Sequence, residues 1–167
     1  SEYWDRALIT AYMATFAVIA SAIIGLVVGS ICAQNKILTN FGLMICDFFQ
    51  TFPSFIYLIP VILLFGITDT SVMIAAISYA TVPATRYTIE GLRSVPSELH
   101  DAGAMSGVSR LQRWTNIELP LAFPHIMLGV NQTVIFALMM IVIGALIGTE
   151  DLGQLIMGAI SRKNGAG

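Results

Sequence analysis

The chain has 167 residues, of which 56% are hydrophobic and 11% are charged, and its formal net charge is −2. Soluble domains contain about 25% charged residues, so this composition excludes a typical soluble protein, and the slight negative charge gives no reason to expect a nucleic-acid partner. The apolar residues are gathered into long blocks and do not follow a helical or strand period, which indicates membrane spans. The sequence therefore predicts an all-α integral membrane protein.

The first apolar block, residues 7–33, contains no charged residue and exceeds the roughly 20 residues that a span needs. The stretch before it carries acids and lacks a basic region followed by a cleavage site, so we do not interpret it as a signal peptide. Cys32 and Cys46 lie inside apolar blocks without a CxxC spacing. We interpret them as small buried hydrophobes and not as metal ligands.

The second block, residues 41–67, contains Pro53 and Pro60, which kink a membrane helix and release backbone carbonyls that neighbouring helices must satisfy. It also contains Asp47, and an acid inside a span is a candidate for the transport pathway. Because Asp47 lies near the predicted cytoplasmic end of its helix, contact with water or pairing with Lys36 is an equal alternative.

The third block, about residues 71–89, is interrupted by Pro83. Arg86 and Glu90 stand four residues apart at its end, a spacing at which they can pair on one face of a helix. Tyr57 and Tyr79 could offer aromatic faces to a quaternary ammonium group, although aromatic residues in membranes usually only pack.

The fourth block, about residues 121–148, carries a polar trio near its first third: Asn131, Gln132 and Thr133. These side chains could line a pathway, and hydrogen bonding between helices is the alternative, which we rate slightly ahead. The sequence after this block, TEDLGQLIMGAISRKNGAG, is too short to span a membrane and is expected to form a short helix at the outer surface.

Basic residues indicate how four such spans are oriented. Five lie on the side of the first and third connections and three on the other side: Lys36, Arg86, Arg93, Arg110 and Arg113 against Arg6, Arg162 and Lys163. Since cytoplasmic loops carry an excess of lysine and arginine, the third connection is predicted to be cytoplasmic and both termini external.

That third connection contains a polar island, SELHDAGAMSGVSRLQRWTNIELP, at residues 97–120. Pro96 suits the start of a first helix and Gly107 its end. The sequence from Ser109 to Gln112 matches a capping box, which predicts a second helix that Pro120 would close. A connection of some 30 residues with its own caps predicts a docking partner, since a simple link between two spans needs only a few residues.

The spacing inside the island resembles the cytoplasmic EAA loop of ABC importer permeases, whose pattern is Glu-Ala-Ala-x3-Gly-x9-Ile-x-Leu-Pro. The matching positions are Asp101, Ala102, Gly103, Gly107, Ile117, Leu119 and Pro120, to which Glu98 adds an acid in the first helical turn. Aspartate replaces the glutamate and glycine the second alanine, while the spacing is intact. The resemblance implies a coupling helix at about 97–107 inside a cytoplasmic loop at 90–120.

Two further stretches, DFFQTFPSFIYLIPVILLFGI at 47–67 and PLAFPHIMLGVNQT at 120–133, look like the permeases of quaternary-amine importers. The resemblance to this subfamily covers about residues 40–153. It implies uptake of glycine betaine, choline, carnitine or proline, with selectivity set largely by an external binding protein. Another small solute, such as an amino acid, is the alternative substrate for a permease of this kind.

Members of this family are multi-pass proteins of the bacterial inner membrane with a type I fold and a five-helix core. The resemblance therefore implies that residues 1–167 form one transmembrane domain with four of those helices, the last being absent. It also implies a second permease copy, two cytoplasmic ATPase subunits, an external binding protein and surrounding lipid as partners. The chain has no GxxxxGK[ST] motif, so we expect no cofactor and no catalysis on it, with ATP and Mg on the ATPase.

Two other kinds of membrane protein remain as rival interpretations. A transporter or channel that works without ATP would need charged pairs deep inside several spans, and only Asp47 comes near that. A membrane anchor that recruits a soluble partner would not require the kinked second block or the polar fourth block.

Overall fold

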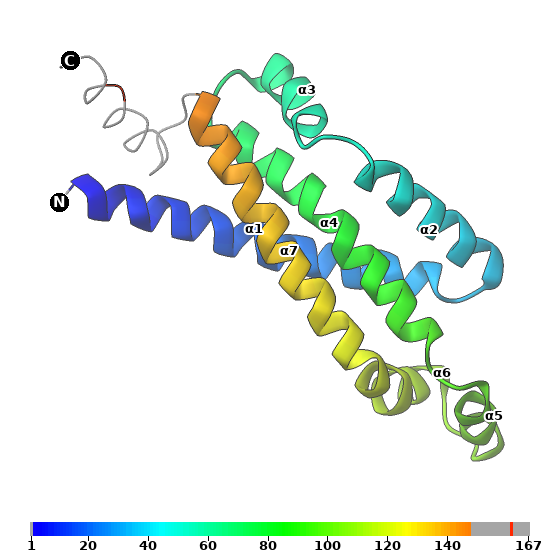
Figure 1. Ribbon diagram of the computed structural model, residues 1–167. Helices are drawn as coiled ribbons and strands as arrows, with labels where there is room; N and C mark the ends of the chain where they lie inside the picture. Colours follow the sequence, from blue (N-terminus) through cyan, green and yellow to red (C-terminus); the bar gives the residue numbers. More distant parts are fainter. Residues whose placement is uncertain (1, 148–160, 162–167) are drawn as a thin grey trace. The chain divides into compact units, whose positions relative to one another are not determined.

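The computed structural model describes residues 2–147 and Ser161, and all regular secondary structure in that part is helical. The elements in chain order are α1 (Glu2–Cys32), α2 (Lys36–Gln50), α3 (Phe55–Phe65), α4 (Asp69–Arg93), α5 (Ser97–Met105), α6 (Arg110–Arg113), the π-helical turn η1 (Trp114–Glu118) and α7 (Leu119–Ile147) (Figure 1). The prediction of an all-α protein is confirmed. Apart from Ser161, the outer-surface helix expected after the fourth block lies outside the described residues.

In the part of the chain that the structure describes, two helical stretches are long and apolar enough to cross a membrane, Ala7–Cys32 and Arg110–Ile147. The short helices α2 and α3 pass the same test only as a pair joined across a bend, which raises the number of candidate spans to three. The sequence also predicts a span at 71–89; helix α4 covers that block but does not pass the same test. Threonines and the charged pair Arg86 and Glu90 make α4 more polar than the other long helices.

The second predicted span is interrupted by a break between α2 and α3. Helix α2 starts at a well-formed cap, where Asn35 Oδ1 accepts a hydrogen bond of 2.8 Å from the Leu38 N–H. It ends at Gln50, and Pro53 follows in the four-residue gap before α3. Because the residue before a proline avoids the helical conformation, a helix tends to stop here instead of merely kinking.

Clustering of contacts divides the chain into two compact units. The first unit combines Ser1–Ser21, Phe52–Ala80 and Thr133–Gly167, and the second combines Ala22–Thr51 and Thr81–Gln132. Helices α1, α4 and α7 each contribute one segment to each unit.

The first unit is held together by an apolar core from α1, α3, α4 and α7. Its buried members are Met13, Ala17, Leu58, Val72, Ala75, Ala76, Tyr79, Ala80, Ala137, Met140 and Ile141. Two hydroxyl groups also bond to carbonyls of α4: Ser21 Oγ donates to Ile77 O at 3.1 Å and Thr133 Oγ1 to Ala80 O at 3.3 Å. Side chains supply the core here, and Gly144 of α7 adds one close approach, since a Cβ atom there would lie 2.4 Å from Val72 Cγ2 of α4.

In the second unit, glycines bring the helix backbones close together. A Cβ atom at Gly25 of α1 would lie 2.3 Å from the Cβ of Ala84 in α4, and one at Gly29 would lie 2.6 Å from the Cβ of Thr88. On the other side of α4, a Cβ atom at Gly129 of α7 would lie 2.7 Å from the Cβ of Tyr87. Small residues at four-residue spacing permit such close approach in membrane helices.

Candidate functional site

The polar island forms the helices that its local sequence predicts. Helix α5 begins directly after Pro96, carries Glu98 in its first turn, and ends at Met105, two residues before the predicted limit. Gly107 has a φ of 70°, the left-handed conformation that commonly ends helices. In α6, Ser109 Oγ accepts from the Gln112 N–H at 3.3 Å and Gln112 Oε1 accepts from the Ser109 N–H at 2.9 Å. The predicted capping box is confirmed.

The prediction that Pro120 closes the second helix is wrong. Residues from Arg110 to Ile147 form one helical stretch of 38 residues, and Pro120 is the second residue of α7 within it. The turn just before it is π-helical, so the Leu119 N–H reaches Trp114 O, one residue further back than in an α-helix. This wider turn accommodates the proline ring, which in a regular α-helix clashes with the carbonyl four residues earlier.

Gly103 lies at a contact between α5 and the helix that follows. A Cβ atom at this position would lie 3.3 Å from both Arg113 Cδ and Ile117 Cδ1, and the residue is buried. Arg113 in turn donates from Nε to Glu118 Oε1 at 3.0 Å. Gly103 therefore packs inward on the start of the long helix instead of facing a partner.

The other motif residues divide by exposure. On and after α5 the exposed residues are Glu98, Asp101, Ala102 and Gly107, and further along Ile117 and Leu119 are half-buried while Pro120 is exposed. One face of α5 is thus free to meet another molecule, and the opposite face is held by α6 and η1.

Asp47 does not pair with Lys36 as the sequence alternative proposed. Its carboxylate forms an ion pair with the guanidinium of Arg86, 39 residues away in the chain. Arg86 also bonds to Glu90 at 3.0 Å, which confirms the pairing predicted from the four-residue spacing, and to Gln50 Oε1 at 3.2 Å. The network ties α2 to α4 inside the second unit, with the Asp47 side chain still 57% exposed.

Tyr57 and Tyr79 belong to an aromatic cluster in the first unit. Their ring centroids are 4.9 Å apart, and Tyr79 stacks on Phe136 with centroids 4.6 Å apart and an interplanar angle of 21°. Sequence reasoning missed Phe136, since nothing local distinguishes it from its apolar neighbours in α7. Tyr79 is buried, and Tyr57 is half-buried.

The three polar residues of α7 differ in how far they are exposed. Asn131 is exposed and Gln132 half-buried, whereas Thr133 is fully buried and makes the hydrogen bond to Ala80 O described above. For Thr133 the alternative of hydrogen bonding between helices is confirmed. Among residues 2–147 and Ser161 no group of three or more histidine, cysteine or acidic side chains could hold a metal ion, and both cysteines are free thiols.

Residues 25–166 match the family of binding-protein-dependent transport system inner membrane components. The chain belongs to this family. It is thus a permease component of an ABC transporter in the inner membrane and not its catalytic subunit, as the EAA spacing and the membrane-length helices predict. The resemblance to quaternary-amine permeases is also confirmed by the similar proteins described next.

The chain is 68% identical over 167 residues to the trimethylamine N-oxide transport system permease protein TmoV of Pelagibacter ubique. The matched region is 100% of this chain and 23% of that protein. It is 37% identical over 159 residues to the glycine betaine/proline betaine transport system permease protein ProW of Salmonella typhimurium, a match that covers 95% of this chain and 45% of ProW. It is 30% identical over 164 residues to the carnitine transport permease protein OpuCD of Listeria monocytogenes, a match that covers 98% of this chain and 72% of OpuCD. The chain thus spans less than half the length of the first two relatives.

Proposed function

We propose that this chain is the translocation segment of an ATP-driven importer for small N-methylated amines, with trimethylamine N-oxide and glycine betaine as first candidate substrates. The observation that carries the proposal is the 68% identity, over the whole chain, to a permease named for trimethylamine N-oxide transport. An amine N-oxide and a betaine share a methylated, positively charged nitrogen that cannot donate hydrogen bonds. Choline, carnitine and proline remain in the substrate class expected from the sequence.

In this proposal residues 1–167 belong to a single type I transmembrane domain, with four helices of a five-helix core and with α4 as the third span. The excess of basic residues around α5 and α6 supports a cytoplasmic position for residues 90–120 and an external position for both termini. A second permease copy, two cytoplasmic ATPase subunits, an external binding protein and surrounding lipid complete the importer. ATP and Mg belong to the ATPase subunits.

Residues 90–120 act as the coupling loop. The exposed face of α5, with Glu98, Asp101 and Ala102, docks in a groove of the ATPase. Gly103 bears on Arg113 and Ile117 on the opposite face, and these residues lie at the start of the continuous helix that ends at Ile147. Because packed helices move as rigid bodies, a displacement of α5 is passed to α7 through this contact.

The remaining motif residues maintain that geometry. Gly107 adopts the left-handed turn that ends α5, and Leu119 and Pro120 follow the π turn at the start of α7. Asp47, Tyr57, Tyr79, Asn131, Gln132 and Thr133 are proposed to border the substrate path. Aromatic faces attract methylated ammonium groups, which supports Tyr57 in particular, while the Asp47 carboxylate is already paired with Arg86.

Reconstitution of the full-length permease with its ATPase and binding protein tests the proposal. We expect ATP-dependent uptake of labelled trimethylamine N-oxide or glycine betaine, and no uptake with a nonhydrolysable nucleotide. Gly107→Pro and Asp101→Lys should abolish substrate-stimulated ATP hydrolysis while the protein stays in the membrane. Uptake without an ATPase would refute the importer assignment, and unchanged uptake by both variants would refute the coupling assignment.

A further inference from the structure

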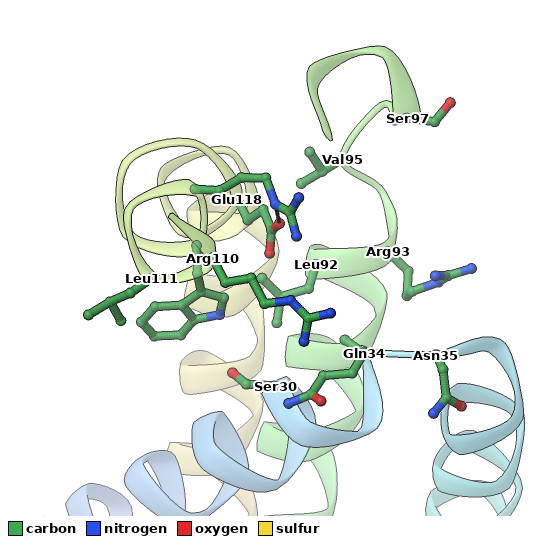
Figure 2. A pocket seen from close by; sticks show the side chains of 13 residues that line it. Ser30, Gln34, Asn35, Leu92, Arg93, Val95, Ser97, Arg110, Leu111 and Glu118 are labelled. Carbon is green, nitrogen blue, oxygen red and sulfur yellow. Dashed lines mark hydrogen bonds and ion pairs between the residues drawn. The ribbon is translucent and has the colours of Figure 1, made fainter. Parts of the chain in front are cut away.

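An open cavity of about 1010 Å³ lies in the second unit, between the end of α1, the end of α4 and the α6–η1 segment (Figure 2). Its lining combines cationic, hydrogen-bonding and apolar side chains. The residues are Ser30, Ala33, Gln34, Asn35, Leu92, Arg93, Val95, Ser97, Arg110, Leu111, Arg113, Trp114 and Glu118. No role proposed above uses the cavity as a binding site.

The charge of the lining is positive. Three of its residues are arginines and one is a glutamate, and that glutamate, Glu118, is already bound to Arg113. In the part of the chain that the structure describes, neither Arg93 nor Arg110 has an ion-pair partner. Two guanidinium charges therefore remain available to a bound anion.

The cavity lies where the apolar helices give way to polar sequence. The apolar block 7–33 ends at Ala33, directly after α1, and the polar residues Gln34 and Asn35 follow it in the lining. Arg93 is the last residue of α4. Trp114, an indole of the kind that gathers at the headgroup level of a bilayer, forms part of the wall. These features indicate the membrane–water boundary.

Figure 2 shows the direction of the side chains. The guanidinium of Arg110 extends from α6 toward the part of the wall formed by Ser30 and Gln34, and Arg93 extends away on the far side. Arg110 thus holds its charge beside the Gln34 amide, whose N–H groups can donate to the same ligand, whereas the Ser30 hydroxyl already donates to Leu26 O at 2.6 Å and can only accept. Guanidinium groups bind phosphate with two parallel N–H donors, which makes Arg110 the principal contact.

We propose that this cavity binds the phosphate of an anionic phospholipid headgroup. Leu111, which is 70% exposed, supplies apolar surface for the glycerol end of the lipid, which a free phosphate ion would not use; Leu92 and Val95 also line the cavity but are buried. The two available arginines favour a headgroup with net negative charge over a zwitterionic one. The inference depends on membrane insertion and is independent of the substrate.

The test uses fluorescence of the full-length permease in nanodiscs with brominated phosphatidylglycerol or brominated phosphatidylcholine. The signal of Trp114 is obtained by subtracting the emission of the Trp114→Phe variant. We expect stronger quenching by phosphatidylglycerol, and a preference about fivefold smaller in Arg110→Gln. Arg93→Gln should lower the preference less. Lys36→Gln, which removes a nearby charge outside the cavity, should leave it unchanged.

Three results would overturn the proposal. Equal quenching by the two lipids would show that no anionic headgroup is selected. Loss of phosphatidylglycerol-specific quenching on addition of millimolar inorganic phosphate at constant ionic strength would assign the cavity to a free ion. A Lys36→Gln effect as large as that of Arg110→Gln would indicate general surface attraction. None of these results bears on uptake, so the importer assignment is tested separately.

Discussion

The two compact units hold segments of the same three long helices together by different means. In the first unit, side chains such as Met13, Tyr79 and Met140 fill the space between α1, α4 and α7. In the second unit, glycines let the backbones approach, and an ion-pair network links α2 to α4. A side-chain core can adjust to a substitution, whereas a backbone contact leaves no atoms that can move aside. The second unit should therefore be the less tolerant of added volume.

The largest effect is expected at Gly25. A valine there would place its Cβ 2.3 Å from Ala84 Cβ and 2.8 Å from backbone atoms of Ala84 and Thr85, so the helices must separate. We expect Gly25→Val to lower the free energy of unfolding by about 3 kcal/mol or more, measured by denaturation with sodium dodecyl sulphate in detergent. Ala11→Val adds volume to an exposed position of the same helix and should be nearly neutral. Equal stability of the two variants would remove the proposed contrast between the units.

A smaller effect is expected for Arg86→Gln, which leaves the carboxylates of Asp47 and Glu90 together without their cation. Because these side chains are partly exposed, we expect a loss of about 1 to 2 kcal/mol. A double-mutant cycle with Asp47→Asn measures how much of that loss in stability is due to the ion pair between Asp47 of α2 and Arg86 of α4. A coupling energy near zero would mean that the network does not hold α2 to α4.

Gly103→Ala tests the contact between α5 and the long helix. Alanine favours the helix by about 1 kcal/mol, and the flexible Arg113 side chain can yield the few tenths of an ångström that its methyl group needs. We expect slower amide hydrogen exchange across 97–105. The matched change Ala102→Gly, at an exposed neighbour, should speed exchange there. Faster exchange in Gly103→Ala would show that the contact is too tight for a methyl group.

The smallest effect is expected for Thr133→Val in the first unit. It removes the hydrogen bond of 3.3 Å to Ala80 O and keeps the shape of the side chain, so the loss should be about 0.6 kcal/mol. Asn131→Ala, at an exposed position of the same helix, should leave stability unchanged and reduce uptake if Asn131 borders the path. A loss above about 2 kcal/mol for Thr133→Val would place it among the essential contacts of the first unit.

Features set by neighbours in the chain could be predicted from the sequence. The capping box of Ser109 and Gln112, the left-handed Gly107 and the pairing of Arg86 with Glu90 each depend on residues at most four positions apart. The partner of Asp47 lies 39 residues away, and only the packing of α2 against α4 brings Arg86 to it. Nothing in the sequence indicated that choice, because Lys36 lies nearer to Asp47 in the chain.

Backbone geometry set by several residues at once was harder to foresee. In the sequence, Pro120 indicates a helix end, since a proline normally disrupts the turn before it. The π turn at Trp114–Glu118 removes that conflict, and no residue type encodes such a turn by itself. Likewise, the replacement of alanine by Gly103 looked like a weakened helix, and its burial against Arg113 and Ile117 became visible only in three dimensions.

The π turn also has a mechanical consequence for α7. Such a turn contains about one residue more than an α-helical turn, and each residue of an α-helix accounts for 100° of rotation and about 1.5 Å of rise. Converting Trp114–Glu118 to α-helical hydrogen bonding would therefore screw the following 29 residues about their own axis by roughly that angle. The conversion would also return the Pro120 ring to its clash with the carbonyl four residues earlier, so the π turn holds α7 in its present rotation.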